Sequence, residues 1–550
     1  MKLTLKMLAV VALATAASGC SSFLDVNTNP NNFTTDSAPT PDAILAQALN
    51  NTAGNYNGNT PSFNSYSSFA ADYVGRSGVI VAYAEERTYN YTTVYMQNLF
   101  SQTYDNLNDY NIIQQNGTSY PNHAAIARIM KAYNFLLLVD EYGDIPYSQA
   151  LKGIANIVPT YDRAQDIYKD LIVQLQGAIA DINAAAAAPI VPRAVGAEDI
   201  VYGGNMTRWK QFANSLQLRI LLRESQTGDA ALNSYISTQM TALQGAADGF
   251  INTDVLSNPG YAANTGQNNP FYNRYGATGV GTAQAERGYQ VPTYYLLKQY
   301  AMNNDSRVNV LYTAGRGPTT GTGPLQVTVN GINYFGTNAG EQNPPLISNM
   351  LPVYASRFLL GTSTTVAGLL KGQTAPTALM LASEHFFNRA EAETRGLFSG
   401  GETAAKSSYE RGIIGSFMYF YRPATTAAVA VPTTASATST VPGVAQASTY
   451  LTAAGTNPLV SYDNAATTAG LGKQYVILYQ KYLAMNGVGS TEAWCDFRRA
   501  AQPKIDISLE NAMGKFPKRL LYPLTEVNTN QANVPKGVTQ YTPIFWDVID

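Results

Sequence analysis

Apolar residues recur at helical spacing along much of this 550-residue chain, and this pattern restricts its fold more than any other feature. One set is Ile126, Ile129, Met130, Tyr133 and Leu137, and a second is Trp209, Phe212, Ala213, Leu216 and Ile220. Each set predicts an amphipathic helix with one buried face. A third helix is predicted to begin with Asp162 as its N-cap and to end before Pro189.

Residues 378–421 contain two helical segments joined by a Gly-rich turn. Ala405 and Tyr409 lie four residues apart in the second segment, as in one hairpin of the tetratricopeptide kind. Such a hairpin cannot bury its apolar face alone, so several must stack. Because no regular repeat of about 34 residues is visible, the sequence predicts a mainly α stack of degenerate tetratricopeptide-like helix pairs.

Two stretches interrupt the helical pattern, and we predict loop-rich insertions at about 251–375 and 423–470. The first is rich in Asn, Gly, Pro and Tyr, and Asn330-Gly331 lies there between alternating β-formers. That dipeptide predicts a small β-hairpin. Residues 423–462 carry no charged side chain and are mostly small or polar, which indicates a long loop.

The N-terminus has the layout of a secretory signal. Lys2 and Lys6 precede an apolar run of about ten residues, and small residues lead directly to Cys20. This arrangement resembles a bacterial lipobox, in which the cysteine is acylated. We therefore predict a signal peptide over residues 1–19, a lipidated tether over 20–40, and a single helical domain over 41–550. An ordinary signal, or a disulfide between Cys20 and Cys495, is the alternative.

Composition narrows the class of ligand. Charged residues make up 13% of the chain, below the usual value of about 25%, and the formal net charge is −2. A basic surface for nucleic acid is therefore not expected. The chain has 37 tyrosines and only three tryptophans, and tyrosine combines a flat apolar face with a hydroxyl that suits contact with sugars or peptides.

The sequence offers few candidates for catalysis or metal binding. His123 and His385 are the only histidines, and neither lies in a metal-binding motif. Cys495 follows a tryptophan, which indicates a small buried side chain. Residues 25–36 have the spacing of a calcium loop, but Pro30 replaces its glycine. We predict no metal and no cofactor. A pair of carboxylates for glycoside hydrolysis has no sequence signature, so a surface glycan hydrolase stays an alternative.

Several segments in the same order resemble those of the SusD/RagB-like nutrient-binding outer-membrane lipoproteins of Bacteroidetes, in the branch whose mature chain opens on a DVNTNPN-like stretch. These segments are FLDVNTNPN (23–31), VDEYGDIPYSQA (139–150), WKQFANSLQLRILLR (209–223), AEAETRG (390–396), QKYLAMNGVGSTEAWCDFRR (480–499) and RLLYPLTEVNTNQAN (519–533).

The resemblance implies a right-handed stack of about four helix pairs with loop-rich insertions on one face. It also implies that the protein is not an enzyme but captures an oligosaccharide or oligopeptide at the cell exterior. There it would act as the lid of a SusC-like TonB-dependent outer-membrane transporter, held by its lipid anchor. A structural envelope protein that binds no small ligand is a second alternative.

Ligand-binding residues are predicted from two loops, at 71–95 and 261–295, that combine tyrosines with fixed polar groups. The candidates are Asp72, Tyr73, Arg76, Tyr83, Tyr89, Asn90, Tyr91, Tyr272, Arg274 and Tyr275. Their aromatic faces would stack on sugar or peptide planes, and their polar groups would set the orientation of the ligand. The alternative for each tyrosine is packing against the scaffold.

Overall fold

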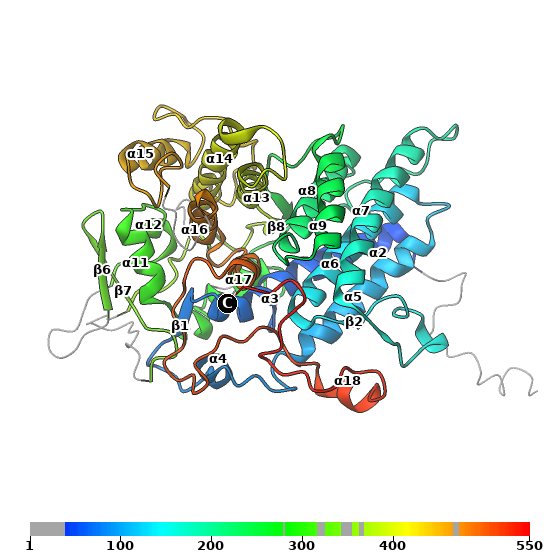
Figure 1. The fold of residues 1–550 in the computed structure, drawn as a ribbon, viewed down its shortest axis with the longest axis horizontal. Helices are drawn as coiled ribbons and strands as arrows, with labels where there is room; N and C mark the ends of the chain where they lie inside the picture. The colour runs from blue at the N-terminus through cyan, green and yellow to red at the C-terminus, as the bar shows by residue number, and fades with distance from the viewer. Residues whose placement is uncertain are drawn as a thin grey trace, which may run out of the picture.

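The computed structural model describes residues 39–278, 281–315, 325–342, 355–361, 368–465 and 472–549. The predicted signal peptide, Cys20 and nearly all of the predicted tether lie outside these ranges. Helices dominate the described part of the chain, which confirms the predicted mainly α fold class (Figure 1). Among these helices, none is both long enough and apolar enough to cross a bilayer.

Consecutive helices of the first half pack against one another: α5 on α6, α6 on α7, α7 on α8 and α8 on α9. They lie side by side on the right of Figure 1. Their bounds, with those of the shorter helices α3 and α4 and the 3₁₀ turn η1, are α2 Pro41–Tyr56, α3 Phe63–Ala70, α4 Ala84–Thr88, α5 Gln97–Gln115, α6 Pro121–Tyr142, η1 Gly153–Ala155, α7 Ala164–Ala186, α8 Met206–Arg223 and α9 Ala230–Gln244.

The second half repeats this packing with α13 between α14 and α16, and α13 also contacts α8. The two sets of helices thus form one stack, as tetratricopeptide-like pairs do. The remaining helices are α10 Pro270–Tyr275, η2 Ala285–Gly288, α11 Tyr294–Met302, α12 Val308–Leu311, α13 Ala382–Thr394, α14 Gly401–Tyr421, α15 Val444–Ala454, α16 Lys473–Met485, α17 Ser490–Ala500 and α18 Leu524–Thr529.

Helix α6 lies at the centre of the first set and is buried on nearly every side. It contacts α5, α7, α2 and α8, which explains why apolar residues continue around its whole circumference. Pro121 occupies its first turn, where the missing N–H has no helical partner to lose. Gly143 ends the helix with a φ of 72°, a conformation that favours glycine.

Helix α7 begins one residue later than predicted, at Ala164, and its N-cap is Arg163 rather than Asp162. Asp162 is not the cap, because its carboxylate accepts hydrogen bonds from the backbone N–H groups of Tyr147 and Ser148, at 3.1 and 2.8 Å. These bonds tie the segment after α6 to the start of α7. The side chain that the local pattern assigned to the N-cap of the helix is thus used in a tertiary contact instead.

The described strands form two-stranded antiparallel sheets, and two of these sheets, β1–β5 and β4–β8, join segments that are far apart in sequence. The pairs are β1 Val74–Arg76 with β5 Gln290–Pro292, β2 Ile145–Pro146 with β3 Tyr161–Asp162, β4 Val255–Ser257 with β8 Thr377–Met380, and β6 Leu325–Val329 with β7 Ile332–Gly336. The last pair confirms the predicted hairpin. Its turn residues Asn330 and Gly331 have φ values of 50° and 77°, as a type I′ turn requires.

The second predicted insertion is not entirely loop, because α15 (Val444–Ala454) lies within it. Val444, Ala447 and Tyr450 are buried on one face of this helix. The ring of Tyr450 packs 5.2 Å from that of Phe417 on α14. The prediction of a continuous loop over 423–462 was therefore wrong at residues 444–454. The small residues there form a helix because one of its faces packs against α14.

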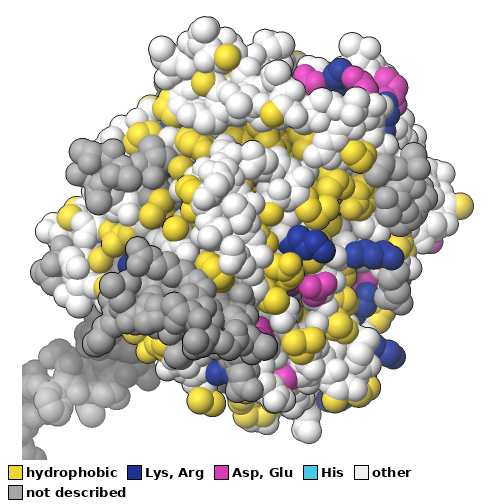
Figure 2. Space-filling model, turned by 90° about the vertical axis from the view of Figure 1, so that its left-hand side faces the viewer, with side chains coloured by type: hydrophobic (Ala, Val, Ile, Leu, Met, Phe, Trp, Pro, Cys, Tyr) yellow, Lys and Arg dark blue, Asp and Glu magenta, His cyan; other side chains and the backbone are white. Residues whose placement is uncertain are grey.

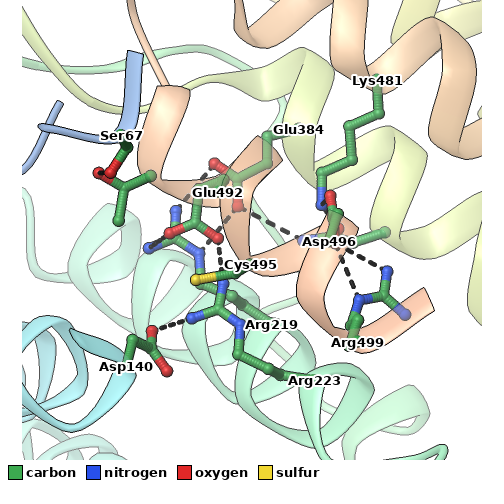
Figure 3. Close-up of polar contacts among 12 residues, drawn as sticks. Ser67, Asp140, Arg219, Arg223, Glu384, Lys481, Glu492, Cys495, Asp496 and Arg499 are labelled. Atoms are coloured by element: carbon green, nitrogen blue, oxygen red, sulfur yellow. Dashed lines mark hydrogen bonds and ion pairs between the residues drawn. The ribbon is translucent and has the colours of Figure 1, made fainter. Parts of the chain in front are cut away.

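A buried network of charged side chains connects helices that are far apart in sequence (Figure 3). Arg219 of α8 donates two hydrogen bonds of 2.8 Å to Glu384 of α13, and its Nη1 lies 3.3 Å from Glu492 of α17. Arg223 of α8 pairs with the same Glu492 and with Asp140 of α6. The network therefore holds the first set of helices against the second through charge as well as apolar packing.

Candidate functional site

The two loops predicted to bind ligand are brought together by the β1–β5 pair. Val74 faces Pro292 and Arg76 faces Gln290 in antiparallel register. Just beyond the pair, the Ser77 hydroxyl donates to the carbonyl of Gly288 at 2.6 Å. Residues separated by more than 200 positions in sequence are thus held side by side, which places the loop segments that flank the two strands near each other.

Three of the predicted tyrosines do not present a face to this region. Tyr73, Tyr89 and Tyr91 are each at most 2% exposed. Tyr73 stacks on Tyr482 of α16 at 4.5 Å and donates to its carbonyl at 2.6 Å. Tyr91 stacks on Tyr95 at 4.7 Å. These rings pack in the core, so in this structure they cannot stack on a ligand.

Tyr89 is buried by the segment that follows α17. Its hydroxyl accepts a hydrogen bond from the backbone N–H of Ser508 at 3.2 Å. Its ring lies 6.1 Å from that of Phe516. A segment more than 400 residues away in sequence covers this tyrosine. Tyr89 is therefore buried, although its position in a loop predicts an exposed side chain.

Asp72 and Arg76 also have structural partners. One carboxylate oxygen of Asp72 accepts from the backbone N–H of Asp506 at 3.2 Å. Burial, together with the nearby Asp506, raises the pKa of Asp72 well above its ordinary value. Arg76 donates to the carbonyls of Ile80 and, at 2.8 Å, Gln342. Asp72 therefore links this loop to the segment after α17, and Arg76 links it to Gln342 and to its own backbone at Ile80.

Helix α10 carries the other three predicted residues. Tyr272 and Tyr275 are buried, whereas Arg274 lies at the surface of a recess. The guanidinium of Arg274 donates to Glu286 at 2.8 Å and to the carbonyl of Asn59 at 2.7 Å. It also lies 5.0 Å from the ring centre of Tyr275, so the buried ring supports the charged group from below.

Two adjoining recesses occur where these loops meet, and we call them the loop-side recesses. One, of about 400 Å³, lies between the turn at 58–60, α10 and η2. The other, of about 280 Å³, lies between Val79, the segment at 283–288 and Arg357. Gln284 and Ala285 line both. The polar side chains around them are Asn59, Thr60, Asn273, Arg274, Gln284, Glu286, Arg287 and Arg357.

The lining of the loop-side recesses suits a polar ligand with many hydroxyls or amides. Gln284 can donate and accept, and no hydrogen bond engages its side chain among the described residues. Burial, and then the nearby guanidinium of Arg357, lower the pKa of Arg287 to about 10, so Arg287 stays charged at neutral pH. Arg287 also donates to the carbonyl of Phe358 at 3.2 Å, which orients it along the wall.

Tyr83 and Asn90 keep some exposure. Tyr83 is half-buried, accepts a hydrogen bond from Gln290 at 3.2 Å, and packs 4.7 Å from the ring of Phe69. Asn90 is exposed. Of the ten predicted residues, Tyr83, Asn90 and Arg274 are therefore those that a ligand can reach without rearrangement.

Sequence reasoning missed much of the lining. Three of the missed residues, Gln284, Glu286 and Arg287, lie inside the predicted loop at 261–295. The predicted loop therefore does line the recesses, but these residues were not selected within it. Asn59 and Arg357 lie outside both loops. No local pattern marks them, because only the tertiary fold places them beside η2.

A larger recess, of about 650 Å³, lies elsewhere, between the end of α17 and the C-terminal segment. Its apolar wall includes Phe497, Phe516 and Tyr541, and Lys504 and Lys515 stand at its rim. Residues 501–549 show little regular periodicity, and no sequence pattern predicted this recess. It is a second place where a ligand could bind.

The histidines and the described cysteine occupy scaffold positions. His385 stacks on Phe250 at 5.1 Å, and burial followed by the charges of Arg389 and Arg411 lowers its pKa to about 3. His123 contacts Glu198 at 3.0 Å. Cys495 is buried, as predicted, and burial raises the pKa of its thiol well above the ordinary value, which opposes thiolate formation.

Within the described residues, no cluster of three or more His, Cys, Asp or Glu side chains is arranged to hold a metal ion. The calcium-like stretch at 25–36 lies outside them. Charged side chains are also sparse on the face shown in Figure 2, where white neutral atoms predominate over the part not covered in grey. This agrees with the low charge content of the chain.

Comparisons with known proteins agree with this fold. A chitin-binding protein of known structure is 22% identical, with a TM-score of 0.67 over 92% of this chain and 100% of its own. A SusD homolog from Bacteroides uniformis is 22% identical, with a TM-score of 0.65 over 92% and 99% of the two chains. A SusD homolog from Parabacteroides distasonis is 21% identical, with a TM-score of 0.69 over 93% and 98%.

No curated protein matches the chain in sequence. A family model does, over residues 30–523, which is most of the chain. That family is SusD-like and is described as starch-binding and associating with the outer membrane. The chain therefore belongs to the SusD-like family, and the predicted resemblance is confirmed.

Proposed function

We propose that this protein is a surface lipoprotein that captures an oligosaccharide or oligopeptide and delivers it to a partner TonB-dependent transporter of the outer membrane. The observation that carries the proposal is the match to the SusD-like family over residues 30–523. Membership links the chain to glycan binding at the outer membrane, and the family consists in general of binding proteins without catalytic activity.

A glycan is the first class of ligand to test. The family description names starch, and one similar structure is that of a chitin-binding protein. The loop-side recesses offer amides, guanidinium groups and one carboxylate rather than a continuous apolar wall. Such groups match the hydroxyls and acetamido groups of sugars, which both donate and accept hydrogen bonds.

The loop-side recesses are our proposed capture site, with Gln284 and Arg287 as its central polar groups. Together they extend over both sides of η2, so an oligomer could follow the surface from Asn59 to Arg357. Val79, which is 45% exposed, adds apolar surface to one of them. A ligand that must be handed onward should bind at about micromolar affinity or more weakly.

The test uses the full mature chain with Cys20→Ala, so that it is free of lipid, and measures binding to maltooligosaccharides, chitin oligosaccharides and neutral peptides by calorimetry. Gln284→Ala should weaken binding by roughly 5–10-fold, because one hydrogen bond to the ligand contributes about 1 kcal/mol. The matched control is Gln176→Ala, at an exposed position on α7, and should leave affinity unchanged.

Two results would contradict the proposal. If Phe516→Ala abolishes binding and Gln284→Ala does not, the capture site is the larger C-terminal recess instead. If mass analysis shows that small amounts of protein convert the ligand continuously, the protein is a hydrolase. Capture at the loop-side recesses is supported if the ligand mass stays unchanged and the Gln284→Ala variant binds the ligand more weakly.

A further inference from the structure

A third recess lies on the helical part of the molecule, away from the loops considered above. It measures about 250 Å³ and is enclosed by α5, α6, α7 and the segment at 147–151. We call it the helix-side recess. The side chains that matter here are Asn111, Gln114, Arg128, Lys131, Tyr147 and Asp170.

Lys131 is the central feature of the helix-side recess. Its half-buried ammonium donates to the side-chain oxygens of Asn111 at 3.0 Å and Gln114 at 2.9 Å. Among the described residues, no carboxylate lies within 4.0 Å of this ammonium. An ammonium has three N–H donors, so the two amide oxygens leave one donor and the whole positive charge without a matched anion.

The other charged groups around the recess already have hydrogen-bond partners of their own. Arg128 donates to Gln174 at 2.8 Å and to Asp181 at 2.9 Å. Its guanidinium lies against Gly177, where a Cβ atom would come within 2.3 Å of it. Asp170 accepts from Gln174 at 3.0 Å and from the hydroxyl of Tyr147. Asp181 is thus paired with Arg128, whereas Asp170 has neutral partners and makes no ion pair with Lys131 within 4.0 Å.

Burial, and then the charge of Arg128, lower the pKa of Lys131 to about 8. The ammonium is therefore mostly charged at neutral pH, but it loses its proton only slightly above it. An anion bound in the recess would stabilise the charged form and raise this pKa again.

The rest of the lining is of the kind that contacts a sugar. Phe135 and Tyr147 pack edge to face at 4.7 Å and form an aromatic wall. The amides of Asn111 and Gln174 are already bonded through both oxygen and nitrogen, and that of Gln114 keeps its N–H donors for a ligand, since no hydrogen bond engages them among the described residues. Each amide oxygen can also accept a second hydrogen bond. The volume is below the roughly 300–1,000 Å³ of sites for drug-sized ligands, so it suits one ring rather than an oligomer.

We infer that the helix-side recess binds an acidic monosaccharide unit, with the carboxylate of a uronate on the Lys131 ammonium and its hydroxyls on the surrounding amides. This site is separate from the proposed capture site, because none of its lining residues belongs to the loop-side recesses. It could anchor the acidic unit of a branched glycan, and its existence does not depend on the transporter.

Calorimetry of the full mature Cys20→Ala chain with D-galacturonate, D-galactose and acetate at neutral pH tests the inference. D-Galacturonate should bind at least about ten-fold more tightly than either of the others. Lys131→Gln should lower that affinity about ten-fold or more. The control is Lys152→Gln, whose exposed ammonium also donates to a side-chain amide, that of Gln149 at 2.7 Å, and it should change nothing.

A second measurement works on the unaltered lysine. The affinity for D-galacturonate should fall as the pH rises through about 8, where Lys131 loses its proton. Acetylation of Lys131 by acetic anhydride, followed by peptide mass spectrometry, should slow when D-galacturonate is present and not when D-galactose is. The inference is overturned if galacturonate does not bind, if acetate or galactose binds equally well, or if acetylation is not slowed.

Discussion

At the scale of single residues, Glu224 stands out because it is buried without a partner. It follows the last residue of α8, and neither of its carboxylate oxygens has a hydrogen-bond partner among the described residues. Burial raises its pKa to about 8, against a smaller opposing effect of Lys169. At neutral pH this side chain is therefore mostly protonated in the folded protein.

Glu224→Gln should stabilise the protein at pH values near 8 and have little effect near 5. The folded state holds the proton more tightly than the unfolded chain, whose glutamate has a pKa of about 4.5. The free energy of unfolding of the wild type therefore decreases as the pH rises from about 4.5 to about 8. Glutamine resembles the protonated acid and removes this loss, which is on the order of 4 kcal/mol at pH 8.

Thermal unfolding followed by circular dichroism at both pH values checks this prediction. Glu402→Gln is the control, because Glu402 is exposed on α14 and its surface pair with Lys473 should contribute less than about 1 kcal/mol. A Glu224→Gln variant that is less stable than the wild type at the higher pH would show that the carboxylate is ionised and paired.

At the scale of elements, α17 is held to α8 chiefly by Glu492. Burial opposes ionisation of this side chain, but Arg219 and Arg223 hold the pKa of Glu492 below its ordinary value. Both guanidinium groups come from α8 and are buried themselves. Removing one charge from such a network leaves the others without compensation, which costs more than the pair contributes.

Glu492→Gln should therefore destabilise the protein by about 3–5 kcal/mol. The matched control is Asp181→Asn, which breaks a half-exposed pair with Arg128 and should cost less than about 1 kcal/mol. Urea unfolding monitored by circular dichroism measures both. The stabilising effect of Glu492 is present above its unfolded pKa of about 4.5 and is lost at lower pH, so the difference from wild type should shrink there. Equal stability of Glu492→Gln and wild type would refute this account of α17.

At the scale of the whole molecule, attachment to the outer membrane is expected to depend on residues 1–20. None of the described helices can cross a bilayer, and the family is described as associating with the outer membrane. Cys20→Ala should give a folded protein that leaves the membrane fraction, whereas Cys495→Ala should stay with it. Fractionation after salt and mild alkaline washes measures this. Retention of Cys20→Ala in membranes would rule out the predicted lipid anchor.

The sequence by itself determined the elements whose signals are local. The spacing of Ile126 to Leu137 and of Trp209 to Ile220 located α6 and α8, because a buried helical face imposes its period on the sequence. Asn330-Gly331 located the hairpin, because few residue pairs tolerate positive φ at both positions. The sequence also placed Arg274 and its neighbours in the loop that lines the loop-side recesses.

Only the tertiary structure decided which side chains face a ligand. Tyr73 and Tyr89 lie in a predicted binding loop, but α16 and the segment after α17 cover them from more than 400 residues away. Arg357 reaches the same recess as Arg287 through a long insertion. Lys131 is a candidate site because α5 and α7 surround it with amides and place no carboxylate within 4.0 Å of its ammonium. The exposure of a side chain and the charges around it depend on residues that are far apart in sequence, so a local sequence pattern does not reveal either.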